Sequence, residues 1–145
     1  MSLTTTEAAF LLGVKKVFDT SDAILIGPGP IKWTRGMISE DKRYIFLLDY
    51  CRGSIRLEKF STNNRYRTNI VLLRYCSTGR HTNPDGTSFD GPHVHIYQEN
   101  FDDKIASPIS EIGITQDSPT IEDVMFKFLA FINTDNCPSI QSSLI

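Results

Sequence analysis

The chain has 145 residues, 40% of them hydrophobic and 10% aromatic, with a formal net charge of −2. These values are ordinary for a globular protein and predict one domain over residues 1–145. No apolar run approaches the roughly 20 residues of a membrane span, and the N-terminus lacks the pattern of a signal peptide, so we expect a soluble cytoplasmic protein without a membrane partner. The cysteines, Cys51, Cys76 and Cys137, form no C-x-x-C pair, which predicts reduced thiols and argues against a zinc finger.

A capping box predicts the first helix. Thr4 and Glu7 have the spacing at which a hydroxyl and a carboxylate each accept a hydrogen bond from the other's backbone N–H group. We expect the helix to run from about Thr6 to Phe18, because apolar residues recur there at helical spacing. Lys15 and Lys16 fall off that apolar stripe.

Short β-rich runs separated by turn residues predict an antiparallel meander between Ile31 and Ile109. The turn between the third and fourth strands is expected at Thr62-Asn63-Asn64. Residues 77–92 form a long loop, and loops of that length are usually functional or disordered. The expected strands are Ile31 to Ser39, Arg43 to Cys51, Ile55 to Phe60, Tyr66 to Cys76, His93 to Gln98 and Lys104 to Ile109.

A second helix is predicted near the C-terminus, with Ser118 as its cap and Pro119 at its first position. Its apolar residues have the spacing of a stripe that packs on a sheet: Ile121, Val124, Met125, Phe128, Leu129 and Ile132. Helices at both ends of a run of strands predict an α+β fold. We expect a twisted antiparallel sheet of five to six strands, curled toward a half-barrel, with both helices packed on one face.

The charge is unevenly distributed along the chain. Residues 52–80 carry seven basic residues against one acidic residue, a balance of +6. Residues 81–123 carry nine acidic residues against Lys104 alone, a balance of −8. Either the two segments neutralise each other, or the basic strands present a surface to an anion.

The basic side chains could converge on one phosphate group. Arg65 and Arg67 share a face of the predicted fourth strand, and Lys59 lies across the predicted turn from them. Arg52 sits at the preceding hairpin turn. Alternatively, the arginines pair with acidic residues such as Asp49, in exposed ion pairs that contribute only about 0–1 kcal/mol.

All three histidines, His81, His93 and His95, fall within fifteen residues. Residues two apart in a strand project from the same face, so we expect His93 and His95 to stand side by side and half-exposed. The turn signal Asn83-Pro84-Asp85-Gly86 could fold His81 and Asp85 back over the strand. Histidine exchanges protons and binds metals near neutral pH, which makes this segment the candidate site.

Three interpretations of the cluster compete. His81, His93 and His95, with or without Asp85, could bind a metal ion. The histidines could instead act as general acid and base without a metal or other cofactor, which suits RNA cleavage by the neighbouring 2′-hydroxyl. In a third, structural interpretation, local hydrogen bonds satisfy the histidines.

The same residues carry a resemblance. The chain resembles a group of uncharacterised bacterial and prophage-borne small proteins that share an H-x-N-P-D-G loop followed by G-x-H-x-H-I-Y and an acidic turn containing a lysine. Ile105 departs from the pattern at a position where an aromatic residue is expected. The phage setting that the resemblance implies favours a nucleic-acid-directed toxin, defence or counter-defence role. The matching residues are His81, Asn83, Pro84, Asp85, Gly86, His93, His95, Ile96, Tyr97, Asp103, Lys104, Ala106 and Pro108, with Asp49, Arg52, Lys59, Arg65, Arg67, Leu73 and Arg74 upstream.

The favoured hypothesis from sequence is a small, metal-independent ribonuclease of toxin type. His93 and His95 would exchange protons with the 2′-hydroxyl and the leaving oxygen, and His81 or Asp85 would orient them. The alternatives are a non-catalytic module that binds nucleic acid or a protein partner, and a metal-dependent hydrolase that uses the three histidines. In the ribonuclease scheme the phosphate is bound by Arg65, Arg67, Lys59 and Arg52.

Overall fold

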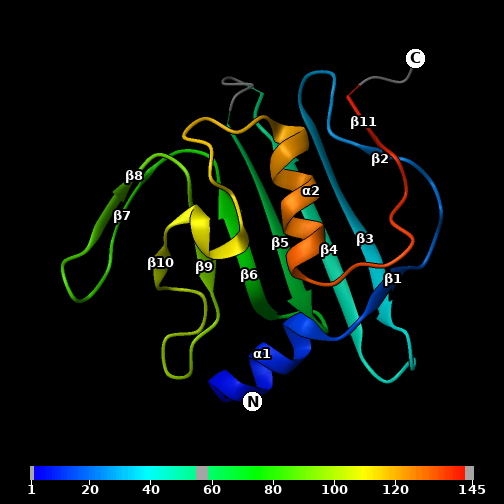
Figure 1. Cartoon of the computed structure of the whole chain (residues 1–145), viewed down its shortest axis with the longest axis horizontal. Coiled ribbons are helices and arrows are strands. Elements are labelled where there is room, and N and C mark those ends of the chain that lie inside the picture. The colour runs from blue at the N-terminus through cyan, green and yellow to red at the C-terminus, as the bar shows by residue number, and fades with distance from the viewer. Residues whose placement is uncertain (1, 55–58, 143–145) are drawn as a thin grey trace.

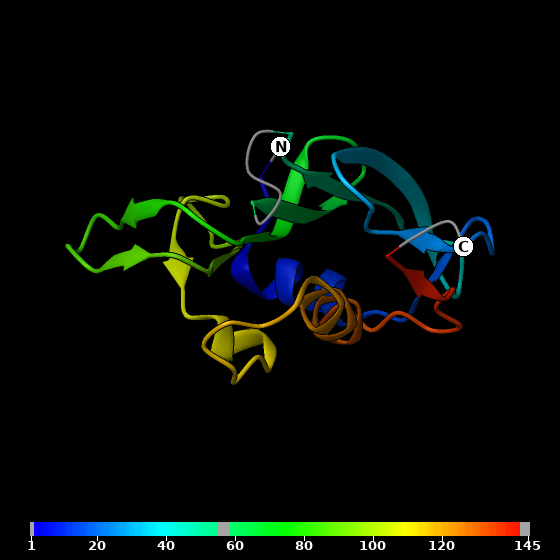
Figure 2. The same cartoon turned by 90° about the horizontal axis from the view of Figure 1, so that it is seen from above.

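Figure 1 shows the computed structural model, which describes residues 2–54 and 59–142. Within these residues, seven strands form one antiparallel sheet in the order β1-β3-β4-β5-β6-β9-β10. The sheet curves around α2 (Ile121–Phe131), and α1 (Thr5–Gly13) lies on the same face (Figures 1 and 2). The predicted α+β fold is therefore confirmed, with two helices at the chain ends and more strands than expected. The strands of this sheet are β1 (Lys16–Phe18), β3 (Ile31–Ser39), β4 (Ile45–Arg52), β5 (Phe60–Tyr66), β6 (Ile70–Cys76), β9 (His93–Ile96) and β10 (Ala106–Ser107).

Smaller elements surround the main sheet. Near the C-terminus, β11 (Ile140–Gln141) pairs in parallel with β2 (Ile24–Leu25). The predicted long loop contains a hairpin of β7 (Arg80–Thr82) and β8 (Ser88–Asp90), which projects from the edge of the molecule in Figure 1. A 3₁₀-helix, η1 (Ile109–Ile112), leads from β10 toward α2.

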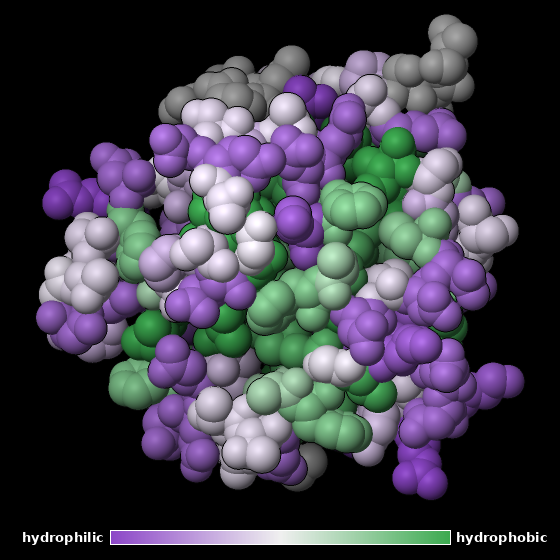
Figure 3. Space-filling model, viewed as in Figure 1, coloured by the Kyte–Doolittle hydropathy of each residue, from purple (hydrophilic) through white to green (hydrophobic). Residues whose placement is uncertain are grey.

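The core lies between the sheet and the helices. The predicted stripe of α2 packs there, since Val124, Met125 and Phe128 are fully buried. Thr120 caps this helix in a capping box with Asp123, two residues beyond the predicted cap. Figure 3 looks onto the face that carries α2 and shows apolar side chains gathered over its middle, with hydrophilic ones around them. No helix in the described part of the chain is long and apolar enough to cross a bilayer.

The first helix is shorter than predicted. The Thr4 and Glu7 capping box is present, but α1 ends at Gly13 and residues 16–18 form β1, which pairs with residues 37–39 at the edge of the sheet. Pairing along an open sheet edge satisfies the backbone of this segment as well as a helix would, so the helical spacing of Val17 and Phe18 was misleading.

Lys16 is fully buried, although the sequence placed it off the apolar stripe. Its Nζ donates to the carbonyls of Leu12 (2.9 Å), Val14 (3.0 Å) and Ile132 (2.8 Å), and lies 4.6 Å from the centroid of the Phe46 ring. The ammonium group therefore satisfies carbonyls at the C-terminal ends of both α1 and α2, where a cation is favoured. Burial lowers the pKa of Lys16 to about 7.

The predicted turn at Thr62-Asn63-Asn64 is wrong. These residues lie inside β5, and the chain turns at residues 67–69, where Arg67 has a φ of 58°. The Oγ1 of Thr62 donates to the carbonyl of Asp49 (2.8 Å), and Nδ2 of Asn64 donates to the carbonyl of Leu47 (3.3 Å). Polar side chains that usually favour turns are satisfied here by the backbone of β4. Residues 55–58 of the expected strand Ile55 to Phe60, including Arg56 and Glu58, lie outside the described residues.

Candidate functional site

The structure brings the three imidazole rings together. His93 and His95 stand on β9 with ring centroids 4.9 Å apart. His81, on β7, lies 4.8 Å from His95 and 6.1 Å from His93 between centroids. The chain runs from His81 to His93 through the β7–β8 hairpin, which projects from the edge of the sheet. Of the two residues expected to return over the strand, His81 reaches the other rings, whereas Asp85 is carried to the exposed tip of the hairpin.

His93 and His95 are buried, with exposed fractions of 4% and 5%, and are not half-exposed as predicted. Their strand lies between β6 and β10 inside the sheet, and Asn83 ties the hairpin to β10. Nδ2 of Asn83 donates to the carbonyl of Ala106 (2.9 Å), and the N–H group of Ala106 donates to Oδ1 of Asn83 (2.8 Å). These two bonds mimic a rung of a β-ladder and hold His81 against the other rings.

The three rings differ in how their nitrogens are hydrogen-bonded. Nδ1 of His93 donates a hydrogen bond to the carbonyl of Gly91 (2.8 Å), because a carbonyl oxygen can only accept. Nε2 of His81 and Nδ1 of His95 are buried, and neither has a hydrogen-bond partner among the described residues. Burial, together with the neighbouring His93 and His81, lowers the pKa of His95 to about 4, so this ring is neutral at pH 7.

Cys76 joins the cluster from the neighbouring strand. It is the antiparallel partner of His93 in the β6–β9 pair. One ligand atom from each of Cys76, His93 and His95 lies within 4.8 Å of the other two. Burial raises the pKa of the Cys76 thiol. Sequence reasoning missed this residue because it lies seventeen positions before His93, and only the pairing of the two strands brings them together.

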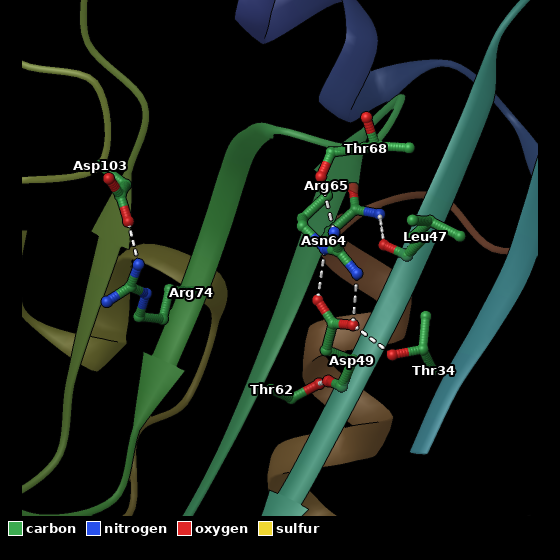
Figure 4. Close-up of polar contacts among 9 residues, drawn as sticks. All are labelled: Thr34, Leu47, Asp49, Thr62, Asn64, Arg65, Thr68, Arg74 and Asp103. Atoms are coloured by element: carbon green, nitrogen blue, oxygen red, sulfur yellow. Dashed lines mark hydrogen bonds and ion pairs between the residues drawn. The ribbon is translucent and has the colours of Figure 1, made fainter. Parts of the chain in front are cut away.

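Arg74 is the antiparallel partner of His95, two pairs along from the Cys76–His93 pair. Its Nη2 forms an ion pair with Oδ2 of Asp103, as Figure 4 shows. Its Nε is buried and has no partner in the described part of the chain. A cationic side chain with one unused donor therefore lies beside the His and Cys side chains.

Arg65 is held by an acidic partner, as the alternative interpretation of the basic residues predicted. Its Nε and Nη2 donate to Asp49 at 2.6 and 2.8 Å, and Nη1 donates to the carbonyl of Thr68 at 2.6 Å (Figure 4). Thr34 also donates to this carboxylate, at 2.6 Å. Burial raises the pKa of Asp49, but the hydrogen bonds from Arg65 and Thr34 outweigh it, and the net pKa is lowered.

The other predicted phosphate-binding residues have different surroundings from those of Arg65. Arg67 sits in the turn after β5 with its guanidinium 5.1 Å from the centroid of the Tyr66 ring. Nη1 of Arg52 donates to the carbonyl of Ile26 (3.3 Å). Lys59 immediately precedes β5, whereas Arg65 lies near the far end of that strand, roughly 17–20 Å away at 3.3 Å per residue. The expected convergence of Lys59 with Arg65 and Arg67 was wrong, because it depended on the misplaced turn.

Asp85 is exposed at the tip of the hairpin. Its Oδ1 accepts a hydrogen bond from the N–H group of Thr87 (2.9 Å), which holds the turn. This bond and those of the turn backbone lower the pKa of Asp85. The residue of the predicted turn that reaches the site is therefore Asn83, through its link to β10.

Comparison with known proteins gives one match. No curated protein and no solved structure matches the chain at a significant level. One family model matches residues 3–134, a range that includes all the histidines and arginines described above. This match confirms the predicted membership of an uncharacterised family. The chain belongs to DUF6978, a family of unknown function.

Proposed function

We propose that the protein is a metalloprotein that binds one transition-metal ion of the Zn²⁺ type through Cys76, His93 and His95. The observation that carries this proposal is the convergence of one sulfur and two ring nitrogens within 4.8 Å of one another. Thiolate and imidazole ligands together favour Zn²⁺ and related ions over the oxygen-preferring Mg²⁺ and Ca²⁺.

The geometry requires only a small contraction. Ligands bound tetrahedrally to Zn²⁺ at 2.0–2.3 Å lie roughly 3.3–3.8 Å from one another. Atoms within 4.8 Å therefore need to approach by about 1 Å, which side-chain torsions can provide. The hydrogen bond from His93 to the carbonyl of Gly91 is the outer contact that typically orients a metal-binding imidazole.

Three protein ligands leave a fourth position for a water, which is the arrangement of catalytic zinc sites. A metal ion in such a site activates the water for hydrolysis. His81 lies beside the three ligands with an unpartnered Nε2, so it can form a hydrogen bond to a water in that position. We therefore propose a hydrolytic centre. This is the metal-dependent class considered from the sequence, with Cys76 as a ligand in place of His81.

The metal-free ribonuclease has less support. General acid catalysis needs a ring that carries a proton near neutral pH and reaches its substrate. His93 and His95 are buried, and His95 is neutral well below pH 7. The guanidinium of Arg65, expected to hold the phosphate, is occupied by Asp49.

Cobalt substitution tests the proposal. Protein stripped with EDTA and titrated with Co²⁺ should bind one equivalent, with a near-ultraviolet charge-transfer band from the thiolate and visible bands of a tetrahedral ion. Cys76→Ser should abolish the charge-transfer band, and His95→Ala should weaken binding. Cys51→Ser is the matched control, because Cys51 is an exposed thiol two strands from Cys76. Absence of the band, or a band that persists in Cys76→Ser, would contradict the proposal.

An RNA assay distinguishes the ribonuclease hypothesis. Degradation of RNA by the EDTA-treated protein, lost in His93→Ala, would support acid–base catalysis and count against the metal centre. Intact RNA under those conditions, with stoichiometric Co²⁺ binding, would support the metal centre.

A further inference from the structure

We infer that Arg74 forms an oxyanion subsite beside the metal centre, so that the ligand of this centre carries a phosphate or carboxylate group. One oxygen would occupy the open position on the metal, and another would accept a hydrogen bond from the guanidinium of Arg74. This inference rests on the proposed function and adds the chemical class of the substrate.

The register of β6 and β9 places Arg74 beside the ligand set. Arg74 is directly opposite His95, and the Cβ atoms of such cross-strand pairs lie about 4.5–5.5 Å apart. Cys76 is two residues further along β6 and so projects from the same face of the sheet.

The guanidinium of Arg74 has capacity for a second anionic partner. Asp103 binds its Nη2, which orients the group, while Nε is buried and unpartnered (Figure 4). Leaving a buried donor unpaired costs about 1–3 kcal/mol, and such groups are few in native proteins. Oδ1 of Asn63, the partner of Arg74 on the other side of β6, is also buried and unpartnered. Of these two unpartnered groups in one cross-strand row, the Arg74 Nε–H group is the donor that an anion can use, and Oδ1 of Asn63 can accept a hydrogen bond from water.

The exposed side of the centre lies over β6. His93 and His95 are covered, whereas Cys76 is half-buried and the side chain of Arg74 is 37% exposed. The exposed part of the Arg74 side chain therefore stands on the solvent side of the proposed centre. A separate hollow of about 230 Å³ reaches Cys76 from the side of Lys59 and Ser61 and is not lined by Arg74.

Arg65 differs from Arg74 in that acceptors occupy its hydrogen-bond donors. It stands on the same face of the sheet, one strand from Arg74, and three of its nitrogens donate to Asp49 and Thr68. Arg74 has one acidic partner and a spare donor. This contrast supplies a matched control.

The experiment uses Co²⁺-loaded protein at constant ionic strength, titrated with inorganic phosphate and, separately, with acetate, while the visible bands are followed. The test variant is Arg74→Met/Asp103→Asn, which removes the cation without leaving an unpaired carboxylate. The control is Arg65→Met/Asp49→Asn, which removes the neighbouring ion pair. Like the test variant, it leaves the net charge of the protein unchanged.

We expect at least one anion to shift the bands of the wild-type protein. Its affinity should fall about tenfold to a hundredfold in the Arg74 double variant and stay unchanged in the Arg65 double variant, since a hydrogen bond to a charged group contributes about 1.5–3 kcal/mol. Tighter phosphate binding would identify a phosphate ester as the substrate class, and tighter acetate binding a carboxylate.

Equal anion affinities in the two double variants, or bands that neither anion shifts, would overturn the inference while the metal centre stands. Failure of the wild-type protein to bind Co²⁺ would overturn both. The fold of each double variant is checked by its own Co²⁺ spectrum before anion is added.

Discussion

Replacing Asn83 with alanine should detach the hairpin that carries His81. The Asn83 side chain is 7% exposed and exchanges two hydrogen bonds with the backbone of Ala106, which is itself 3% exposed. Each such bond contributes about 1 kcal/mol, and its loss also leaves a buried N–H or carbonyl group unpaired. With water satisfying part of the unpaired N–H and carbonyl groups of Ala106, the free energy of unfolding should fall by about 2–4 kcal/mol.

Urea denaturation measures this loss, and Thr82→Ala provides the control. Thr82 precedes Asn83 on the same hairpin but is exposed, with one hydroxyl contact of 3.2 Å to Ser88, so its replacement should cost less than about 0.5 kcal/mol. Native-state hydrogen exchange should show faster exchange of the Ala106 amide in Asn83→Ala alone. If the two variants lose equal stability, or if the Ala106 amide stays protected, the hairpin is not held by Asn83.

Three further predictions concern the core, the N-terminus and the metal. Lys16→Met should lower the free energy of unfolding, measured in urea, by about 2–3 kcal/mol, since three carbonyls lose their donor. The control is Lys15→Met at an exposed position, which should cost under about 0.5 kcal/mol. The folded pKa of Lys16, about 7, lies below its ordinary 10.5, so the unfolded chain binds an extra proton between these values. The wild-type protein should therefore gain stability over Lys16→Met as pH rises through this window, by at most about 1.4 kcal/mol per pH unit, and parallel profiles would contradict burial of the charge. Tyr97→Phe should cost about 1–2 kcal/mol and expose the amide of Leu3 to exchange, because the hydroxyl bonds both its N–H group (2.9 Å) and its carbonyl (3.0 Å); an unaltered Leu3 exchange rate would refute this. Zn²⁺ at a hundredfold excess over its dissociation constant should stabilise the protein by about 2.7 kcal/mol in thermal melts; the gain should vanish in Cys76→Ser, and its persistence there would place the metal elsewhere.

The fold was predictable where one periodic signal dominated. The strand Ile31 to Ser39 has the predicted bounds because its more buried residues alternate with more exposed ones. The stripe of α2 packs into the core because its apolar residues recur at helical spacing. The predictions failed where tertiary partners satisfied residues that locally favour another structure. Lys16 is drawn into the core by carbonyls at two helix ends, and Asn64 lies within a strand because the backbone of β4 accepts its amide hydrogen bond.

The candidate site was predictable only in part, for a related reason. The histidines are close in sequence, and alternation along a strand placed His93 and His95 together without knowledge of the fold. Cys76 and Arg74 reach them only through the register of β6 against β9, which no local pattern reports. The expected group of arginines failed because its geometry depended on one turn, and moving that turn by a few residues separates the side chains along the strand.

A bulge in β6 determines which face of the sheet receives Arg74 and Cys76. The register passes from Arg65 opposite Val71 to Asn64 opposite Leu73, so Leu72 is an extra residue, and Leu72 and Leu73 are both fully buried. Strict alternation from Leu72 would turn residues 74 and 76 toward the core, beneath α2. The extra residue reverses the alternation, so that these two side chains stand beside the imidazoles on the opposite face. Bulges commonly re-aim side chains next to functional sites, and this one is what allows β6 to supply both the proposed thiolate ligand and the proposed anion-binding cation.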